Sequence, residues 1–196
     1  MRKLSKTLPL IVLMSLGSGL TAQEAGTAAG DAVDPGLDMG REVQEATYFR
    51  GTYDDWKMRC IRNDTKDEAD DLCQSYQLLY EASGNPVAEF TLYRLPEGSP
   101  ATAGATVVVP LGTLLPAELK MRVDDGPAKS YAYSFCTAIG CVSRIGLTAE
   151  EVAALKAGSQ ATLTIVPAQA PDQSVDIPVS LKGFTAAYED ASVLAN

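Results

Sequence analysis

Beyond residue 46, apolar and polar residues alternate with a period of two, which is typical of β-strands that bury one face. The run 175–181 shows this most simply, because valine, isoleucine and leucine occupy every second position. Pro178 interrupts it without a backbone N–H to donate, so we expect this strand at a sheet edge. Such patterns predict about nine strands, at 53–61, 74–80, 87–95, 105–109, 119–123, 131–135, 142–145, 161–165 and 175–181.

Turn residues separate several of these strands. Asp125-Gly126 follows the strand at 119–123, and the segment 83–86 (Ser-Gly-Asn-Pro) follows the strand at 74–80. Residues of these types favour the tight turns of β-hairpins. We therefore expect two hairpins at these positions.

One helix is clearly signalled among the strands. Thr148, followed three residues later by Glu151, forms a capping box, and Gly158 is placed to end the helix in a left-handed conformation. A weaker helical signal covers 186–192. Many short antiparallel strands without alternating helices predict an all-β fold, an antiparallel β-sandwich with one short helix.

The N-terminal region divides into two segments before the predicted sandwich domain at 47–192. Residues 1–22 have a basic start, a short apolar run and small residues at the end, as in a secretory signal peptide. The apolar run is shorter than the roughly 20 residues that span a bilayer, so we expect no transmembrane segment. Residues 23–46 are rich in alanine, glycine and acids, and we predict a flexible acidic leader there.

Composition and charge exclude several functions. The 196 residues include no histidine, which excludes Ser-His-Asp catalysis and the usual zinc sites. There are 25 acidic and 16 basic residues, a net charge of -9, which argues against nucleic acid as a partner. We identify no catalytic residue, no cofactor and no metal site.

Four cysteines are expected to form disulfides in an exported chain. Three connectivities are possible. The local pairs Cys60–Cys73 and Cys136–Cys141 are favoured. The first would close a charged loop, and Gly140 can adopt a positive φ in the tight turn that brings the second pair together. A redox-active pair of Cys136 and Cys141 in a thiol oxidoreductase is the alternative, although such pairs usually have two intervening residues and lie at a helix N-terminus.

Two further features have a structural and a functional interpretation. Trp56 is expected to fill the core beside the Cys60 disulfide, with carbohydrate stacking as the alternative. Acidic residues could hold calcium, but they lack the spacing of a calcium loop, so a solvated loop is favoured. These acids are Asp54, Asp55, Asp64, Asp67, Glu68, Asp70 and Asp71.

Six segments occur in a characteristic order over about residues 48–191: Asp55–Cys60, Cys73-Gln74, Val87–Phe90, Val109–Gly112, Cys136–Cys141 and Val179–Phe184. Together they resemble the invasion associated locus B family. This resemblance implies an exported bacterial protein with an immunoglobulin-like β-sandwich and four structural cysteines. It implies no enzymatic motif, and the family is named for a member linked to entry into host red cells.

We therefore expect a non-enzymatic envelope protein that presents a sandwich surface to an unidentified protein or surface polymer of the envelope or host, with host-cell invasion as one role. The expected location is the periplasm, with outer-membrane association or the cell surface as variants. The alternatives are a periplasmic chaperone or assembly factor that exposes an unpaired strand, a thiol oxidoreductase, and a glycosidase with two carboxylates.

Overall fold

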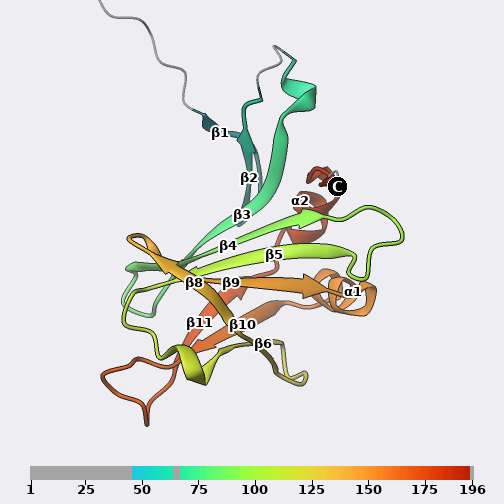
Figure 1. The fold of residues 1–196 in the computed structure, drawn as a ribbon. Coiled ribbons are helices and arrows are strands. Elements are labelled where there is room, and N and C mark those ends of the chain that lie inside the picture. The colour runs from blue at the N-terminus through green and yellow to red at the C-terminus, as the bar shows by residue number, and fades with distance from the viewer. Residues whose placement is uncertain (1–45, 64–66, 195–196) are drawn as a thin grey trace, which may run out of the picture. The chain divides into compact units, whose positions relative to one another are not determined.

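The computed structural model of the protein describes residues 46–63 and 67–194. They form two antiparallel sheets (Figure 1). The larger sheet has the strand order β1-β2-β3-β4-β5-β9-β8, and the smaller has the order β11-β10-β6-β7. The predicted signal peptide and nearly all of the predicted leader lie outside the described residues. The elements are β1 (Thr47–Tyr53), β2 (Trp56–Ile61), η1 (Glu68–Asp70), β3 (Leu72–Tyr80), β4 (Pro86–Arg94), β5 (Ala103–Val109), η2 (Leu115–Ala117), β6 (Leu119–Val123), β7 (Lys129–Tyr131), β8 (Tyr133–Thr137), β9 (Gly140–Leu147), α1 (Ala149–Ala157), β10 (Gln160–Ile165), β11 (Val175–Ser180) and α2 (Phe184–Asp190).

The predicted all-β sandwich is confirmed, as are both hairpins. β3 pairs with β4 and β6 pairs with β7, each in antiparallel register across the predicted turn. β11, which contains Pro178, forms an edge of the four-stranded sheet, as expected. Since proline has no backbone N–H to donate, it disturbs the hydrogen bonds of a sheet least in an edge strand.

Two of the predicted strands differ from the structure, one because it is divided and one because it is shorter. The strand expected at 131–135 is β7 followed by β8, which belong to different sheets. The chain changes sheets at Ala132, whose carbonyl oxygen accepts a hydrogen bond from Ser143 Oγ at 3.0 Å. The strand expected at 53–61 is β2 alone, and a tight turn at Asp54, with φ of 50°, separates it from the unpredicted β1.

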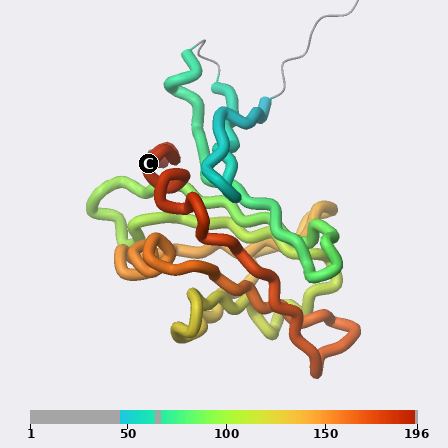
Figure 2. The backbone as a smooth tube through the Cα atoms, turned by 180° about the vertical axis from the view of Figure 1, so that it is seen from behind, coloured from blue at the N-terminus to red at the C-terminus, as the bar shows by residue number. Residues whose placement is uncertain are grey.

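Both helical signals correspond to helices. α1 begins at the capping box of Thr148 and Glu151, as predicted. The left-handed stop at Gly158 is wrong, because this residue has φ of -76° and ψ of 166°. Glycine is needed there for space, since a Cβ would lie 2.5 Å from Val123 Cγ1. α2 begins two residues before the predicted second helix and packs against the sheet surface of β1–β4, as the rear view shows (Figure 2).

The main core lies between the two sheets and contains Trp56, whose side chain is fully buried. Its ring makes edge contacts with Phe90 and Phe184, and its Nε1 donates to Ser180 O at 2.9 Å. Carbohydrate stacking by Trp56 is therefore wrong, because no part of the ring is accessible. Its expected place beside the Cys60 disulfide is also wrong, since that disulfide belongs to a separate small cluster.

The two sheets are joined along one side by the buried side chain of Gln77 on β3. Its Oε1 accepts from Ser180 N at 3.0 Å, and its Nε2 donates to Ser180 O at 3.1 Å. Nε2 also donates to Asp55 O at 3.2 Å. The amide of Gln77 thus takes the place of a neighbouring strand for the edge strand β11.

Candidate functional site

The four cysteines form the two local disulfides that the sequence favours, Cys60–Cys73 and Cys136–Cys141. Each joins directly opposite residues of a β-hairpin, β2–β3 in one case and β8–β9 in the other. The first is fully buried, whereas Cys136 is exposed and Cys141 is buried. Neither pair lies at a helix N-terminus, which is the setting that activates thiolates in oxidoreductases.

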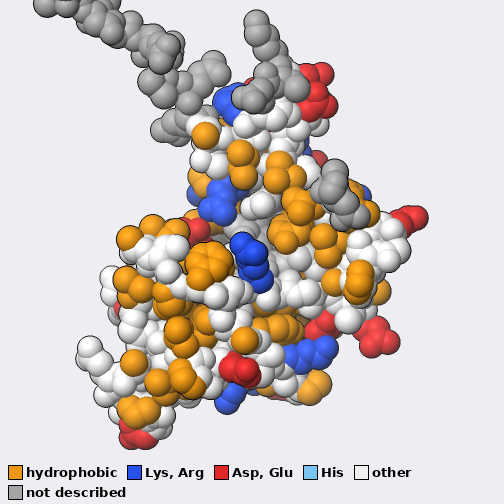
Figure 3. Space-filling view, in the orientation of Figure 1, with side chains coloured by type: hydrophobic (Ala, Val, Ile, Leu, Met, Phe, Trp, Pro, Cys, Tyr) orange, Lys and Arg blue, Asp and Glu red, His pale blue; other side chains and the backbone are white. Residues whose placement is uncertain are grey.

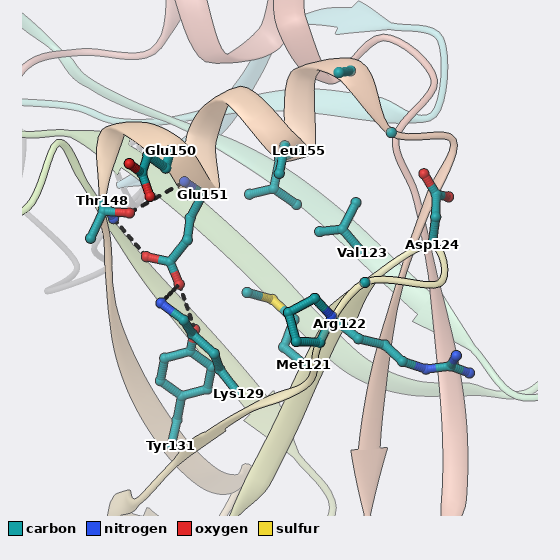
Figure 4. Close-up of a pocket in the computed structure, with 15 residues that line it drawn as sticks. Met121, Arg122, Val123, Asp124, Lys129, Tyr131, Thr148, Glu150, Glu151 and Leu155 are labelled. Atoms are coloured by element: carbon teal, nitrogen blue, oxygen red, sulfur yellow. Dashed lines mark hydrogen bonds and ion pairs between the residues drawn. The ribbon is translucent and has the colours of Figure 1, made fainter.

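A pocket of about 460 Å³ lies between α1 and the β6–β7 hairpin (Figure 4). Its central polar group is the carboxylate of Glu151, which contacts Lys129 Nζ at 2.7 Å and accepts from Thr148 N at 2.8 Å. Tyr131 OH donates to the same carboxylate at 3.3 Å. Three donors therefore converge on one acid, and those of Lys129 and Tyr131 link the helix to the hairpin.

The pKa values of the groups in this pocket indicate a structural role for Glu151 rather than a role in proton transfer. Burial tends to raise the pKa of the Glu151 carboxyl, but the hydrogen bonds from Lys129 and Thr148 outweigh it and lower the pKa. Burial, followed by the charge of Glu151, raises the pKa of Tyr131 to about 12. A general acid near neutral pH needs a carboxyl with a raised pKa, so Glu151 does not suit the glycosidase alternative.

The acidic segment before β3 uses its carboxylates to organise its own backbone. Asp67 Oδ1 accepts from Ala69 N at 2.9 Å, and Asp71 accepts from Asn63 N at 3.0 Å and from Tyr48 OH at 2.8 Å. Within 46–63 and 67–194, no group of three or more acidic or cysteine side chains is placed to hold a metal ion. Asp64 lies outside the described residues.

The outward faces of the two sheets differ in chemistry. On the four-stranded sheet, the outward positions are polar apart from Pro178, and they include Lys120, Arg122, Thr162, Thr164 and Asp176. The seven-stranded sheet instead carries aromatic and aliphatic side chains on the face turned away from α2, with basic groups among them (Figure 3). We call this surface the open face. Its apolar members are Phe49, Tyr76, Leu78, Tyr93, Val108, Phe135 and Val142.

Each basic side chain of the open face lies over an aromatic ring. Lys57 Nζ is 5.2 Å from the centroid of Phe49, and Arg144 Cζ is 5.5 Å from that of Phe135. Arg59 lies 4.5 Å from the centroid of Tyr76 and also pairs with a carboxylate of β4, Glu89. Phe49 is 55% exposed and Phe135 is 44% exposed. The open face thus offers apolar area and positive charge together.

The open face was not predicted from the sequence. The signal that could have found it is that β3 and β4 are apolar or aromatic on both faces, as in LCQSYQLLY, although only one face meets the core. No helix in the part of the chain that the structure describes is long and apolar enough to cross a membrane.

Comparisons with known proteins agree in pointing to one family. The family model of the invasion associated locus B (IalB) protein matches residues 56–192. Invasion protein B homologs from two strains of Brucella abortus are each 28% identical over 149 residues, which are 76% of this chain and 82% of the relative. The crystal structure of invasion associated protein B from Bartonella henselae matches with a TM-score of 0.58 and 24% identity, over 73% of this chain and 93% of that chain. This last similarity shows a common fold.

Proposed function

Because the chain belongs to the invasion associated locus B family, we propose that it is an exported, non-enzymatic envelope protein that binds its partner through the open face. Export is supported by the signal-peptide pattern of residues 1–22 and by two disulfides, which persist in oxidising compartments. The Brucella relatives are named invasion protein B homologs, so a contact with the host-cell surface is the specific form of this function that we infer.

The single observation that carries the proposal is the contrast between the two outward sheet faces of one molecule. A solvated sheet face is normally polar, as the four-stranded sheet demonstrates with Lys120, Thr164 and Asp176. An apolar surface rimmed by polar groups is typical of an interaction site. Among the outward sheet positions that the structure describes, aromatic side chains such as Phe135 lie on the open face, and none lies on the four-stranded sheet.

The proposal is tested by placing a photo-crosslinking amino acid at Thr106, in the centre of the open face, in cells that export the protein. The matched control carries the same amino acid at Lys120, which points outward from the four-stranded sheet. We expect an adduct only at Thr106, and we expect a Val108→Glu change on the same face to abolish it. Equal adducts at both positions, or none at Thr106, would contradict the proposal.

A further inference from the structure

The open face contains a continuous row of residues that crosses five strands. In directly opposed pairs, Lys57 faces Tyr76, Tyr76 faces Thr91, Thr91 faces Thr106, and Thr106 faces Arg144. These residues lie on β2, β3, β4, β5 and β9, which are neighbours in this order. The row therefore has a cation at each end and three hydroxyl-bearing side chains between them.

From this row we infer that the partner of the open face is an acidic polysaccharide, lying across the strands with its carboxylates at Lys57 and Arg144. This inference rests on the proposed function of the open face and names the chemistry of its partner. Four strand spacings of roughly 4.8 Å separate the two cations, so they lie about 19 Å apart. A small anion reaches one of them, whereas an extended polyanion reaches both.

The charges of the row are available to an external anion. Neither Lys57 nor Arg144 forms an ion pair with a carboxylate within 46–63 and 67–194, while most of the basic side chains there do. Each cation instead lies over an aromatic ring, which restricts its motion before a ligand arrives. This positive row is found on a chain whose net charge is -9, so its sign is opposite to that of the whole molecule.

The centre of the row favours sugars over other anionic partners. Thr106 offers a hydroxyl group at the centre of the row, which suits a sugar hydroxyl and would face the acyl chains of a membrane poorly. Tyr76 and Thr91 are buried beneath the surface of the row, and Thr91 Oγ1 donates to Thr106 O at 3.3 Å. An acidic peptide strand binds a sheet through backbone groups at an edge. On the open face these backbone groups are already paired within the strand ladder, so a peptide would find few partners there.

The test measures binding of oligomannuronate to the purified full chain by isothermal titration calorimetry, with a neutral mannan oligomer of equal length as the matched ligand. We expect Lys57→Gln and Arg144→Gln each to weaken binding roughly tenfold, since each removes a charged hydrogen bond. Lys120→Gln changes the net charge equally on the other sheet and should weaken it less than about twofold. Thr106→Val, which removes one hydroxyl, should weaken it roughly fivefold. The mannan should not bind.

The competing outcomes are separable. Absence of binding to oligomannuronate, or an equal loss in the Lys57, Arg144 and Lys120 variants, overturns the inference. Binding only to phosphatidylglycerol vesicles, with Thr106→Val binding them more tightly, replaces the polysaccharide by a membrane. If oligomannuronate does not compete with the adduct formed at Thr106, the polysaccharide is excluded while the proposed function of the open face stands. Each variant is checked by its thermal midpoint, which should match that of the parent protein.

Discussion

Replacing Gln77 with leucine removes the side-chain amide that joins β11 to the seven-stranded sheet. Three hydrogen bonds are lost, two with the backbone of Ser180 and one with the carbonyl of Asp55. Ser180 O keeps its bond from Trp56 Nε1, but Ser180 N and Asp55 O lose the partner that Gln77 supplied. At about 1 kcal/mol for each bond, the free energy of unfolding should fall by about 3 kcal/mol.

Urea denaturation followed by the fluorescence of the single tryptophan measures this loss, because Trp56 is fully buried and contacts the same joint. Gln74→Leu on the outward face of β3 is the matched control, since the Gln74 side chain makes no hydrogen bond to any residue of 46–63 or 67–194, and it should cost less than about 0.5 kcal/mol. Gln77→Glu places a carboxylate beside two carbonyl oxygens, which should raise the pKa of the introduced carboxyl, so this variant should lose stability as the pH rises. A loss below about 1 kcal/mol for Gln77→Leu would refute the assigned role.

Three further changes test the packing and the electrostatics. Gly183→Ala should cost at least about 2 kcal/mol, because φ is 83° and a Cβ would collide with Tyr53 O. Gly84→Ala, where φ is 87° but the space around the residue is open, should cost about 1 kcal/mol. Equal shifts of the thermal midpoint in the two variants would contradict this. Glu151→Gln should cost about 1 kcal/mol at pH 7. Burial tends to raise the pKa of the Glu151 carboxyl, but its hydrogen bonds lower it below the usual 4.5, so the difference from the parent should begin to shrink below pH 4.5 and disappear once the pH passes the lowered pKa of the folded protein; a difference that does not change with pH would oppose this. Removing the β2–β3 disulfide, whose cysteines are 13 residues apart, should lower the free energy of unfolding by about 3 kcal/mol. Removing the β8–β9 disulfide, whose cysteines are 5 residues apart, should lower it by about 2 kcal/mol. A lower urea midpoint for the variant without the β8–β9 disulfide than for the other variant would refute this.

Local patterns predicted local structure well. The capping box of Thr148 begins α1, Pro178 lies in an edge strand, and the favoured cysteine pairs are those that form. Each of these depends on residues close together in the sequence, where spacing and turn chemistry set the geometry. The break at Ala132 has no local signal. It arises because β7 pairs with β6 in one sheet and β8 pairs with β9 in the other, although β7 and β8 belong to one alternating run in the sequence.

The candidate site was less accessible to prediction for a similar reason. The row from Lys57 to Arg144 combines residues 87 positions apart, and their alignment is fixed by four successive strand registers. Alternation indicates that two faces differ, but it does not tell which face meets the core when both are apolar. Gly158 shows the same limit, since its glycine is required by the neighbouring Val123 rather than by its own dihedral angles.

The difference between the outward faces of the two sheets also has a consequence for how many surfaces one molecule can contact. Under the proposed function, the open face contacts another surface and the four-stranded sheet faces water, so a single copy would have one binding side. Such a body can coat a surface in a layer with its hydrophilic side outward, but through its sheets it cannot bridge two surfaces. Any tethering of one cell to another by this protein would therefore require a second copy or a second component.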